Sequence, residues 1–340
     1  MRTHNARRLS RREFLGGLSL VGTAGCLGVH PRLVAAEPPP ETTRLRLVRV
    51  PGICVAPEYV AEELLQGEGF TEVHYVEKEG SASKQTALAS GEVDLTLQFS
   101  GPLLLQMDTG DLVVILAGVH VGCWELFGTE RVRTIRDLKG KTIAIAEVRS
   151  AHHVFLASVV AYVGLDPQKD ITWVTHQPEK AMQLFAEGKI DAFMALAPQT
   201  QELRAKQIGH VVVNSSVDRP WSQYFCCMVA GNREFVRKHP VATKRAVRAL
   251  LKAADICALE PERTARFLVE KDYVKRYDYA LQTMQEVPYD KWREYDPEDT
   301  VRFYALRLHE AGMIKSSPQK LIAQGTDWRF LNELKKELKR

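Results

Sequence analysis

The chain has 340 residues, of which 45% are hydrophobic and 26% charged, and its 46 basic and 42 acidic side chains give a formal net charge of +4. This length and composition indicate a globular protein with a large core in two lobes or domains, and they exclude a disordered chain. The first 36 residues hold six of the basic side chains and one acid, so no basic surface remains that would indicate a nucleic-acid partner.

Residues 1–36 have the order of a secretory signal peptide. Arginines precede an apolar stretch over residues 14–29, and Glu13 is the only acid. Residues 10–15, Ser-Arg-Arg-Glu-Phe-Leu, match the twin-arginine export signal, and the alternative is an ordinary basic head with two adjacent arginines. Glycines make the stretch too short and too weakly apolar for a membrane span, which needs about 20 apolar residues. We therefore predict export to the periplasm by the twin-arginine route.

Two processing sites compete in this leader. Val34-Ala35-Ala36 has the small residues that a signal peptidase needs, which favours cleavage after Ala36. Thr23-Ala24-Gly25-Cys26 resembles a lipoprotein box with a poor first residue. Lipidation of Cys26 would anchor the mature protein to the membrane without changing its fold.

The remaining cysteines do not form a disulfide framework, because their number is odd and their spacing is unpaired. They are Cys54, Cys123, Cys226, Cys227 and Cys257. We expect free thiols, with a single bridge as the alternative, and we predict no cofactor and no metal site.

After the leader, strands alternate with helices in two successive sets, which is typical of mostly parallel sheets covered by helices. The first set has strands at 45–50, 72–77, 93–98 and 112–119, and helices at 57–66, 83–90 and 102–109. The second has strands at 142–146, 171–174, 190–194 and 210–213, and helices at 151–162, 179–186 and 199–206. From Val236 onward the pattern is helical, with helices expected at 241–259, 262–270, 279–285, 301–311 and 330–338.

The two sets share an internal echo. Residues 87–94 and 184–191 both read as a helix end, a glycine, one charged residue, a β-branched residue and an aspartate. A glycine directly after a helix can adopt the left-handed conformation that ends it, and the β-branched residue begins the next buried strand. Each copy leads towards a helix that begins near a proline, Pro102 or Pro198. Two copies indicate two lobes of similar design.

The order and spacing of these segments resemble the type II periplasmic binding proteins of the nitrate, sulfonate and taurine class, whose superfamily includes thiamine-pyrimidine synthase-like proteins. The matching segments are 56–69, 80–94, 110–117, 135–141 and 188–192. The resemblance implies an α/β fold of two lobes with a helical C-terminal extension. The domains would be 44–128 for the first part of lobe 1, 129–222 for lobe 2 and 223–340 for the return to lobe 1, with crossovers near 127–132 and 221–229.

The resemblance also implies a monomeric solute-binding subunit of an ABC importer, with a permease as its partner, that closes two lobes around a small ligand. The ligand would be a small organic anion or heterocycle: a sulfonate, taurine, nitrate, a pyrimidine-like compound or an aromatic acid. Two alternatives remain. Phe225-Cys226-Cys227-Met228 faintly resembles the cysteine-rich element of the pyrimidine synthases, which would make the chain an enzyme. The other interpretation of these two cysteines is buried thiols on a strand that returns to the first lobe. A sensor subunit is the second alternative.

Ligand would lie where strand ends and helix N-termini of the two lobes face each other, because free backbone N–H groups there favour anionic groups. The predicted ligand-binding residues are Gly52, Ile53, Cys54, Ser81, Ser83, Phe99, Ser100, Trp124, Ser150, His152, His153 and Tyr224. Ser81 and Ser83 have helix capping as the alternative role. His152 and His153 point about 100° apart on a helix, so they do not form a paired metal site.

Overall fold

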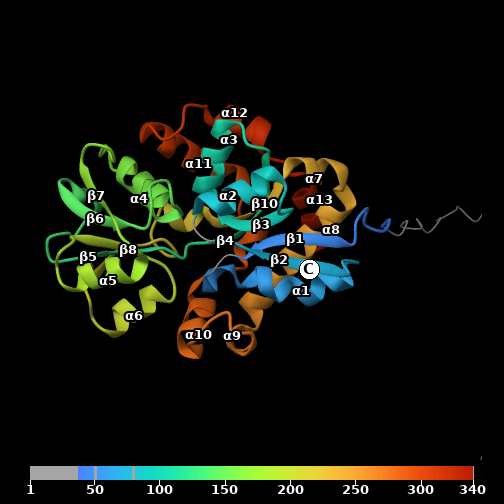
Figure 1. Cartoon of the computed structure of the whole chain (residues 1–340), viewed down its shortest axis with the longest axis horizontal. Coiled ribbons are helices and arrows are strands. Elements are labelled where there is room, and N and C mark those ends of the chain that lie inside the picture. Colours follow the sequence, from blue (N-terminus) through green and yellow to red (C-terminus); the bar gives the residue numbers. More distant parts are fainter. Residues whose placement is uncertain (1–36, 50–51, 79–80, 340) are drawn as a thin grey trace, which may run out of the picture. The chain divides into compact units, whose positions relative to one another are not determined.

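The computed structural model describes residues 37–49, 52–78 and 81–339, and from Pro39 onward the chain forms one compact unit. The predicted twin-arginine signal and the cleavage and lipidation sites lie outside the described residues. Two five-stranded sheets with surrounding helices organise the compact unit, which confirms the predicted α/β class (Figure 1). Among the described helices, none is both long and apolar enough to cross a membrane.

The first sheet combines strands from two distant parts of the chain. Its strands are β1 (Arg44–Arg49), β2 (Glu72–Glu77), β3 (Leu95–Phe99), β4 (Val113–Val121) and β10 (Phe225–Asn232), in the order β2-β1-β3-β10-β4. β1 is parallel to β2 and β3, whereas β10 is antiparallel to β3 and β4. Between the early strands lie η1 (Ile53–Val55), α1 (Ala56–Gly67), α2 (Ser81–Ser90) and α3 (Ser100–Thr109). All residues of β4 and β10 are buried, so these two strands lie entirely within the core.

The second sheet repeats the plan of the first. Its strands are β5 (Glu125–Gly128), β6 (Lys141–Ile145), β7 (Ile171–Thr175), β8 (Ala192–Ala195) and β9 (His210–Asn214), in the order β7-β6-β8-β5-β9. β6 is parallel to β7 and β8, and β5 is antiparallel to β8 and β9. The associated helices are η2 (Ile135–Leu138), α4 (Ala151–Tyr162), α5 (Pro178–Ala186), α6 (Gln199–Ala205) and η3 (Trp221–Gln223). In both sheets one strand, β10 or β5, runs antiparallel to both of its neighbours.

The internal echo in the sequence corresponds to the same local structure in both sheets. Gly91 and Gly188 have positive φ angles of 77° and 69°, which a side chain would strain. The aspartate that follows then binds the neighbouring strand: Asp94 accepts from the Arg46 N–H at 2.8 Å, and Asp191 accepts from the Thr142 N–H at 2.8 Å. Each repeated aspartate therefore fixes the start of its strand against the preceding parallel strand.

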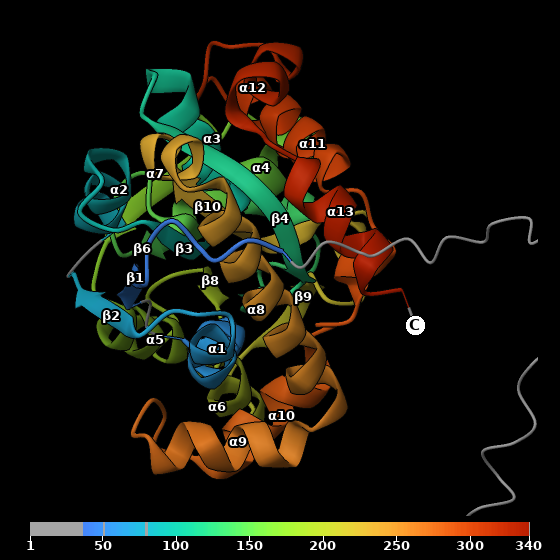
Figure 2. The same ribbon diagram turned by 90° about the vertical axis from the view of Figure 1, so that its right-hand side faces the viewer.

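The C-terminal part is helical, and prolines set most of its helix starts because proline has the φ angle of a first helical turn. The elements are α7 (Arg233–Lys238), α8 (Pro240–Leu259), α9 (Pro261–Glu270), α10 (Tyr277–Glu286), η4 (Lys291–Arg293), α11 (Pro297–Glu310), α12 (Pro318–Gly325) and α13 (Arg329–Glu337). α8 packs along α1 (Figure 2), and α11 packs against both α3 and α4. The extension therefore contacts helices associated with both sheets.

The first crossover lies earlier than predicted. β4 ends at Val121 in the first sheet and β5 begins at Glu125 in the second, so the chain crosses at 122–124 rather than at 127–132. Gly122 and Cys123 both have positive φ, 65° and 117°, and a side chain at Gly122 would collide with Ser216. The return crossover spans the residues between β9 and β10, and it overlaps the predicted segment 221–229.

Candidate functional site

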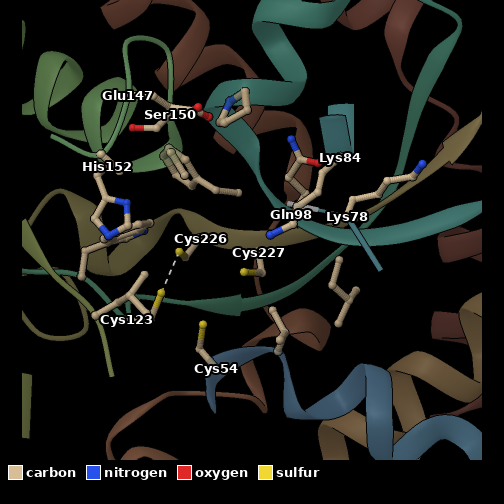
Figure 3. A pocket seen from close by; sticks show the side chains of 18 of the residues that line it. Cys54, Lys78, Lys84, Gln98, Cys123, Glu147, Ser150, His152, Cys226 and Cys227 are labelled. Atoms are coloured by element: carbon tan, nitrogen blue, oxygen red, sulfur yellow. Dashed lines mark hydrogen bonds between the residues drawn. The ribbon is translucent and has the colours of Figure 1, made fainter. Parts of the chain in front are cut away.

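A cavity of about 650 Å³ lies between the two sheets (Figure 3). Its lining comes from the end of β3, the beginning of β10, η1, the first turn of α4, the crossover after β4 and the loop after β6. Single residues in α2 and α3, after β2 and β8, and before α5 complete it. The lining residues are Cys54, Val55, Lys78, Lys84, Leu97, Gln98, Phe99, Pro102, Cys123, Trp124, Ala146, Glu147, Ser150, Ala151, His152, Gln177, Leu196, Cys226 and Cys227. Both halves of the compact unit therefore contribute to one site.

One part of the lining is polar and carries two lysines. In Figure 3, Lys78, Lys84 and Gln98 lie together, across the cavity from His152. Lys78 forms an ion pair with Glu92 at 2.6 Å. Burial lowers the pKa of Lys84, and the charge of Glu147 opposes this shift. A half-buried ammonium beside an amide is well suited to bind an anionic or polar solute.

Aromatic rings form another part of the lining. Trp124 is buried and stacks on Phe155, with 5.7 Å between the ring centroids. Phe99 packs edge-on against Trp124, with 6.0 Å between the centroids. His152 packs edge-on against Trp124 at 4.6 Å, and burial lowers the pKa of His152 to about 4. The indole N–H of Trp124 is buried without a hydrogen-bond partner among the described residues. This wall therefore offers neutral aromatic surface to a solute.

The N-terminus of α4 also faces the cavity. Ser150 caps this helix, and its hydroxyl accepts a hydrogen bond from the His153 N–H at 3.4 Å. Ser150, Ala151 and His152 all line the cavity. The positive end of the helix dipole is directed at the same space as Lys84, which favours an anionic group there.

Four thiols form the floor of the cavity. Cys54 lies in η1, Cys123 lies at the crossover, and Cys226 and Cys227 lie in β10. The sulfur atoms of Cys123 and Cys226 are 3.0 Å apart, and Figure 3 shows the four side chains converging. Burial raises the pKa of Cys226, but hydrogen bonds from Cys123 and Cys227 outweigh it and lower that pKa to about 5. Hydrogen bonds from Cys123 and Cys227 likewise lower the pKa of Cys54.

The structure places five of the predicted ligand-binding residues in the cavity lining, namely Cys54, Phe99, Trp124, Ser150 and His152. Ligand contact by these residues stays a prediction. Gly52, Ile53 and Ser83 are close in sequence to lining residues but do not line the cavity themselves, and the side chain of Ser81 lies outside the described part of the chain.

Three predicted residues face elsewhere. Ser100 is fully buried in the first turn of α3. His153 accepts a hydrogen bond from the Arg149 N–H at 2.9 Å and packs against Trp173, beside a separate smaller hollow. Tyr224 stacks on Phe303 at 4.0 Å. His152 and His153 diverge because adjacent helical residues point in different directions, as the sequence indicated.

The sequence prediction missed Lys78, Lys84, Gln98, Cys123, Cys226 and Cys227 as lining residues. Lys78 directly follows β2 and Gln98 directly precedes Phe99, so the rule that strand ends face the site could have identified both. Cys226 and Cys227 were noted only for their faint likeness to the pyrimidine synthases, because thiols on a buried strand are usually apolar core. Cys123 carried no signal in the sequence.

The sequence model of the NMT1-like family matches residues 38–270, about two thirds of the chain. The chain belongs to the NMT1-like family.

Relatives of this family member share its fold at low sequence identity. The periplasmic nitrate-binding protein NrtA from Synechocystis is 15% identical with a TM-score of 0.70, over 88% of this chain and 90% of that one. The alkanesulfonate-binding protein SsuA from Xanthomonas axonopodis pv. citri, bound to MOPS, is 20% identical with a TM-score of 0.66. The match covers 86% of this chain and 100% of that one. These likenesses confirm the periplasmic-binding-protein fold.

A curated relative matches by sequence as well. The nitrate import ATP-binding protein NrtC from Synechocystis is 24% identical over 239 residues, which are 64% of this chain and 35% of that protein. The chain therefore spans about a third of the length of this relative.

Proposed function

We propose that this protein is the extracytoplasmic solute-binding subunit of an ABC importer. The observation that carries the proposal is the cavity between the two sheets, lined by both and large enough for a small organic solute. The family membership, the fold shared with nitrate- and sulfonate-binding proteins, and the predicted export signal support it. Its partners are the solute and a membrane permease.

The proposed solute is a small organic anion with an apolar or aromatic part. Lys84, Gln98 and the N-terminus of α4 favour an anionic group, whereas Trp124 and Phe99 offer apolar surface. Bare nitrate would leave the aromatic wall unused. An alkyl or aryl sulfonate or an aromatic carboxylate fits both walls. Binding between the sheets would shift the population towards a closed form, which the permease would recognise.

A thermal-stability screen of protein comprising residues 37–340, which includes the whole compact unit, tests the proposal. The solutes are alkyl and aryl sulfonates, taurine, nitrate, aromatic carboxylates and pyrimidines, with iron and pyridoxal phosphate as controls. One class of organic anion is expected to raise the melting temperature by mass action and to remain unconsumed. Absence of stabilisation by every solute would contradict the proposal, and turnover would favour the enzyme alternative.

Lys84→Met then tests the proposed orientation of the anion. Methionine keeps the apolar stem and removes the charge, so affinity for the stabilising anion is expected to fall about tenfold or more. Lys320→Met, at an exposed lysine of α12 that does not line the cavity, is the matched control and should leave affinity unchanged. Equal affinity of the two variants would mean that the anion binds elsewhere.

A further inference from the structure

The thiol floor of the cavity has the composition of a soft-metal site. Within the described part of the chain, one ligand atom each from Cys54, His120 and Cys123 lies within 4.8 Å of the other two. Cys226 adds a sulfur 3.0 Å from that of Cys123, and Cys227 is the next residue on β10. Donors from η1, β4 and the crossover therefore meet at one place, and the thiols of β10 lie beside them (Figure 3).

His120 has the arrangement of an imidazole prepared to bind a cation. It is fully buried in β4, and its Nδ1 lies 3.2 Å from the Val121 carbonyl oxygen. An Nδ1–H that donates to a carbonyl leaves the Nε2 lone pair free, which is the usual arrangement behind a metal-binding histidine. Nε2 has no hydrogen-bond partner among the described residues, although burial of such a nitrogen is costly.

The backbone holds Cys54 and Cys123 in position. The Tyr289 hydroxyl donates to the Cys54 carbonyl at 3.0 Å and so fixes η1 beneath the cavity. Cys123 has φ of 117°, a conformation that is strained for any residue with a side chain. At this strained position the Cys123 sulfur lies 3.0 Å from the Cys226 sulfur.

Cys257 shows what a purely structural thiol looks like in the same protein. It is fully buried within α8, and burial raises its pKa. In the cavity floor, by contrast, the sulfur atoms of Cys123 and Cys226 lie 3.0 Å apart, and Cys54 lies within 4.8 Å of Cys123 and His120. Each of these thiols therefore has another candidate ligand beside it.

We propose that Cys54, His120 and Cys123, with a fourth ligand from Cys226 or Cys227, bind one thiophilic d¹⁰ cation, Cu⁺ or Zn²⁺, at the floor of the cavity. Thiolate sulfur and imidazole nitrogen are the donors that these ions prefer, whereas Mg²⁺ and Ca²⁺ require oxygen. Binding forms metal–sulfur and metal–nitrogen bonds, and each coordinating thiol releases its proton to solvent. The inference rests on the proposed function in placing ion and organic solute in one cavity.

Metal titration of reduced protein, residues 37–340, kept under anaerobic conditions tests the inference. Zn²⁺ and Cu⁺ are added separately against a chromogenic chelator of known affinity, and bound metal is counted by elemental analysis. One ion per chain is expected, with proton release. Cys54→Ser and Cys123→Ser should each weaken binding by at least about tenfold. Cys257→Ser is the matched control and should bind as the wild type does.

A second measurement keeps the inference testable if a variant folds poorly. In wild-type protein, bound metal should protect Cys54, Cys123 and at least one of Cys226 and Cys227 from alkylation and leave the alkylation of Cys257 unchanged, as mass spectrometry would show. Absence of bound Zn²⁺ and Cu⁺, equal binding by Cys54→Ser, or a complete Cys123–Cys226 disulfide in protein isolated from the periplasm would overturn it. Preference for iron over both ions would overturn the proposed ion class.

The outcome is separable from that of the proposed function. Organic anions are screened on metal-free protein, and metal is titrated without organic solute. Metal binding without any stabilising solute would contradict the transport proposal alone, whereas solute binding without metal would contradict the metal site alone.

Discussion

Glu58 is fully buried in the first turn of α1. One carboxylate oxygen accepts a hydrogen bond from the Leu97 N–H at 3.0 Å, and the other has no partner among the described residues. Burial raises the pKa of Glu58 to about 8, and the hydrogen bond from Leu97 opposes this shift. Because Leu97 lines the cavity, this carboxyl group supports the backbone of the candidate site.

Glu58→Gln tests this environment. The folded protein holds the Glu58 proton more tightly than the unfolded chain does, so the contribution of Glu58 to stability is complete below about pH 4.5 and is lost as the pH rises to about 8. That loss should be on the order of 3–5 kcal/mol in the free energy of unfolding. Glutamine does not titrate, so the free energy of unfolding of the variant should lack this decline. Urea unfolding measured between about pH 4.5 and pH 8 checks it. Identical pH profiles would show that Glu58 is ionised in the fold.

At the scale of the elements, the sequence predicted most strands and helices because hydrophobic periodicity is local information. The start of α11 was missed by several residues, since Asp296 caps the helix and Pro297 begins it four residues before the apolar positions that set the expectation. β5, α7 and α12 were not predicted. β5 has only four residues and its pairing with β8 and β9 is non-local, which no local pattern reveals. The thiol floor was missed for the same reason, because it joins residues from distant segments.

The repeated aspartates make a matched pair for mutation. Asp94 is buried and pairs with Arg46, whereas Asp191 pairs with the half-exposed Arg131. Asn at either position can still accept the backbone N–H of the neighbouring strand, so mainly the ion pair is lost. Asp94→Asn should lower the free energy of unfolding by about 2–4 kcal/mol. Asp191→Asn should cost about 1 kcal/mol or less, because solvent screens the exposed pair. Urea unfolding measures both, and an equal cost would contradict the role of burial.

For the molecule as a whole, the C-terminal helices connect the helices around the first sheet to those around the second. These contacts limit hinge motion between the two sheets. α11 packs against α3 and α4, and Gln168, which precedes β7, donates to the Ala311 carbonyl at 3.1 Å. Arg204 in α6 binds Glu286 in α10 through two hydrogen bonds of 3.0 and 2.6 Å. α10 packs against η1 and α8, so this ion pair links the second sheet's helices to those of the first. Closure around a solute must keep or re-form these contacts.

Glu286→Gln tests whether the pair between α6 and α10 stabilises the closed form. Both partners are partly exposed, so the pair contributes up to about 1 kcal/mol, and its loss should weaken binding of the stabilising anion by about two- to fivefold. Small-angle scattering should show a larger radius of gyration for the solute-free variant, because the open form becomes more populated. Glu298→Gln removes a comparable pair within α11, between Glu298 and Arg302, and should change neither quantity. If Glu286→Gln behaves like this control, the pair between α6 and α10 does not govern closure, and the contacts of α11 with α3 and α4 would be the ones that hold the two sheets together.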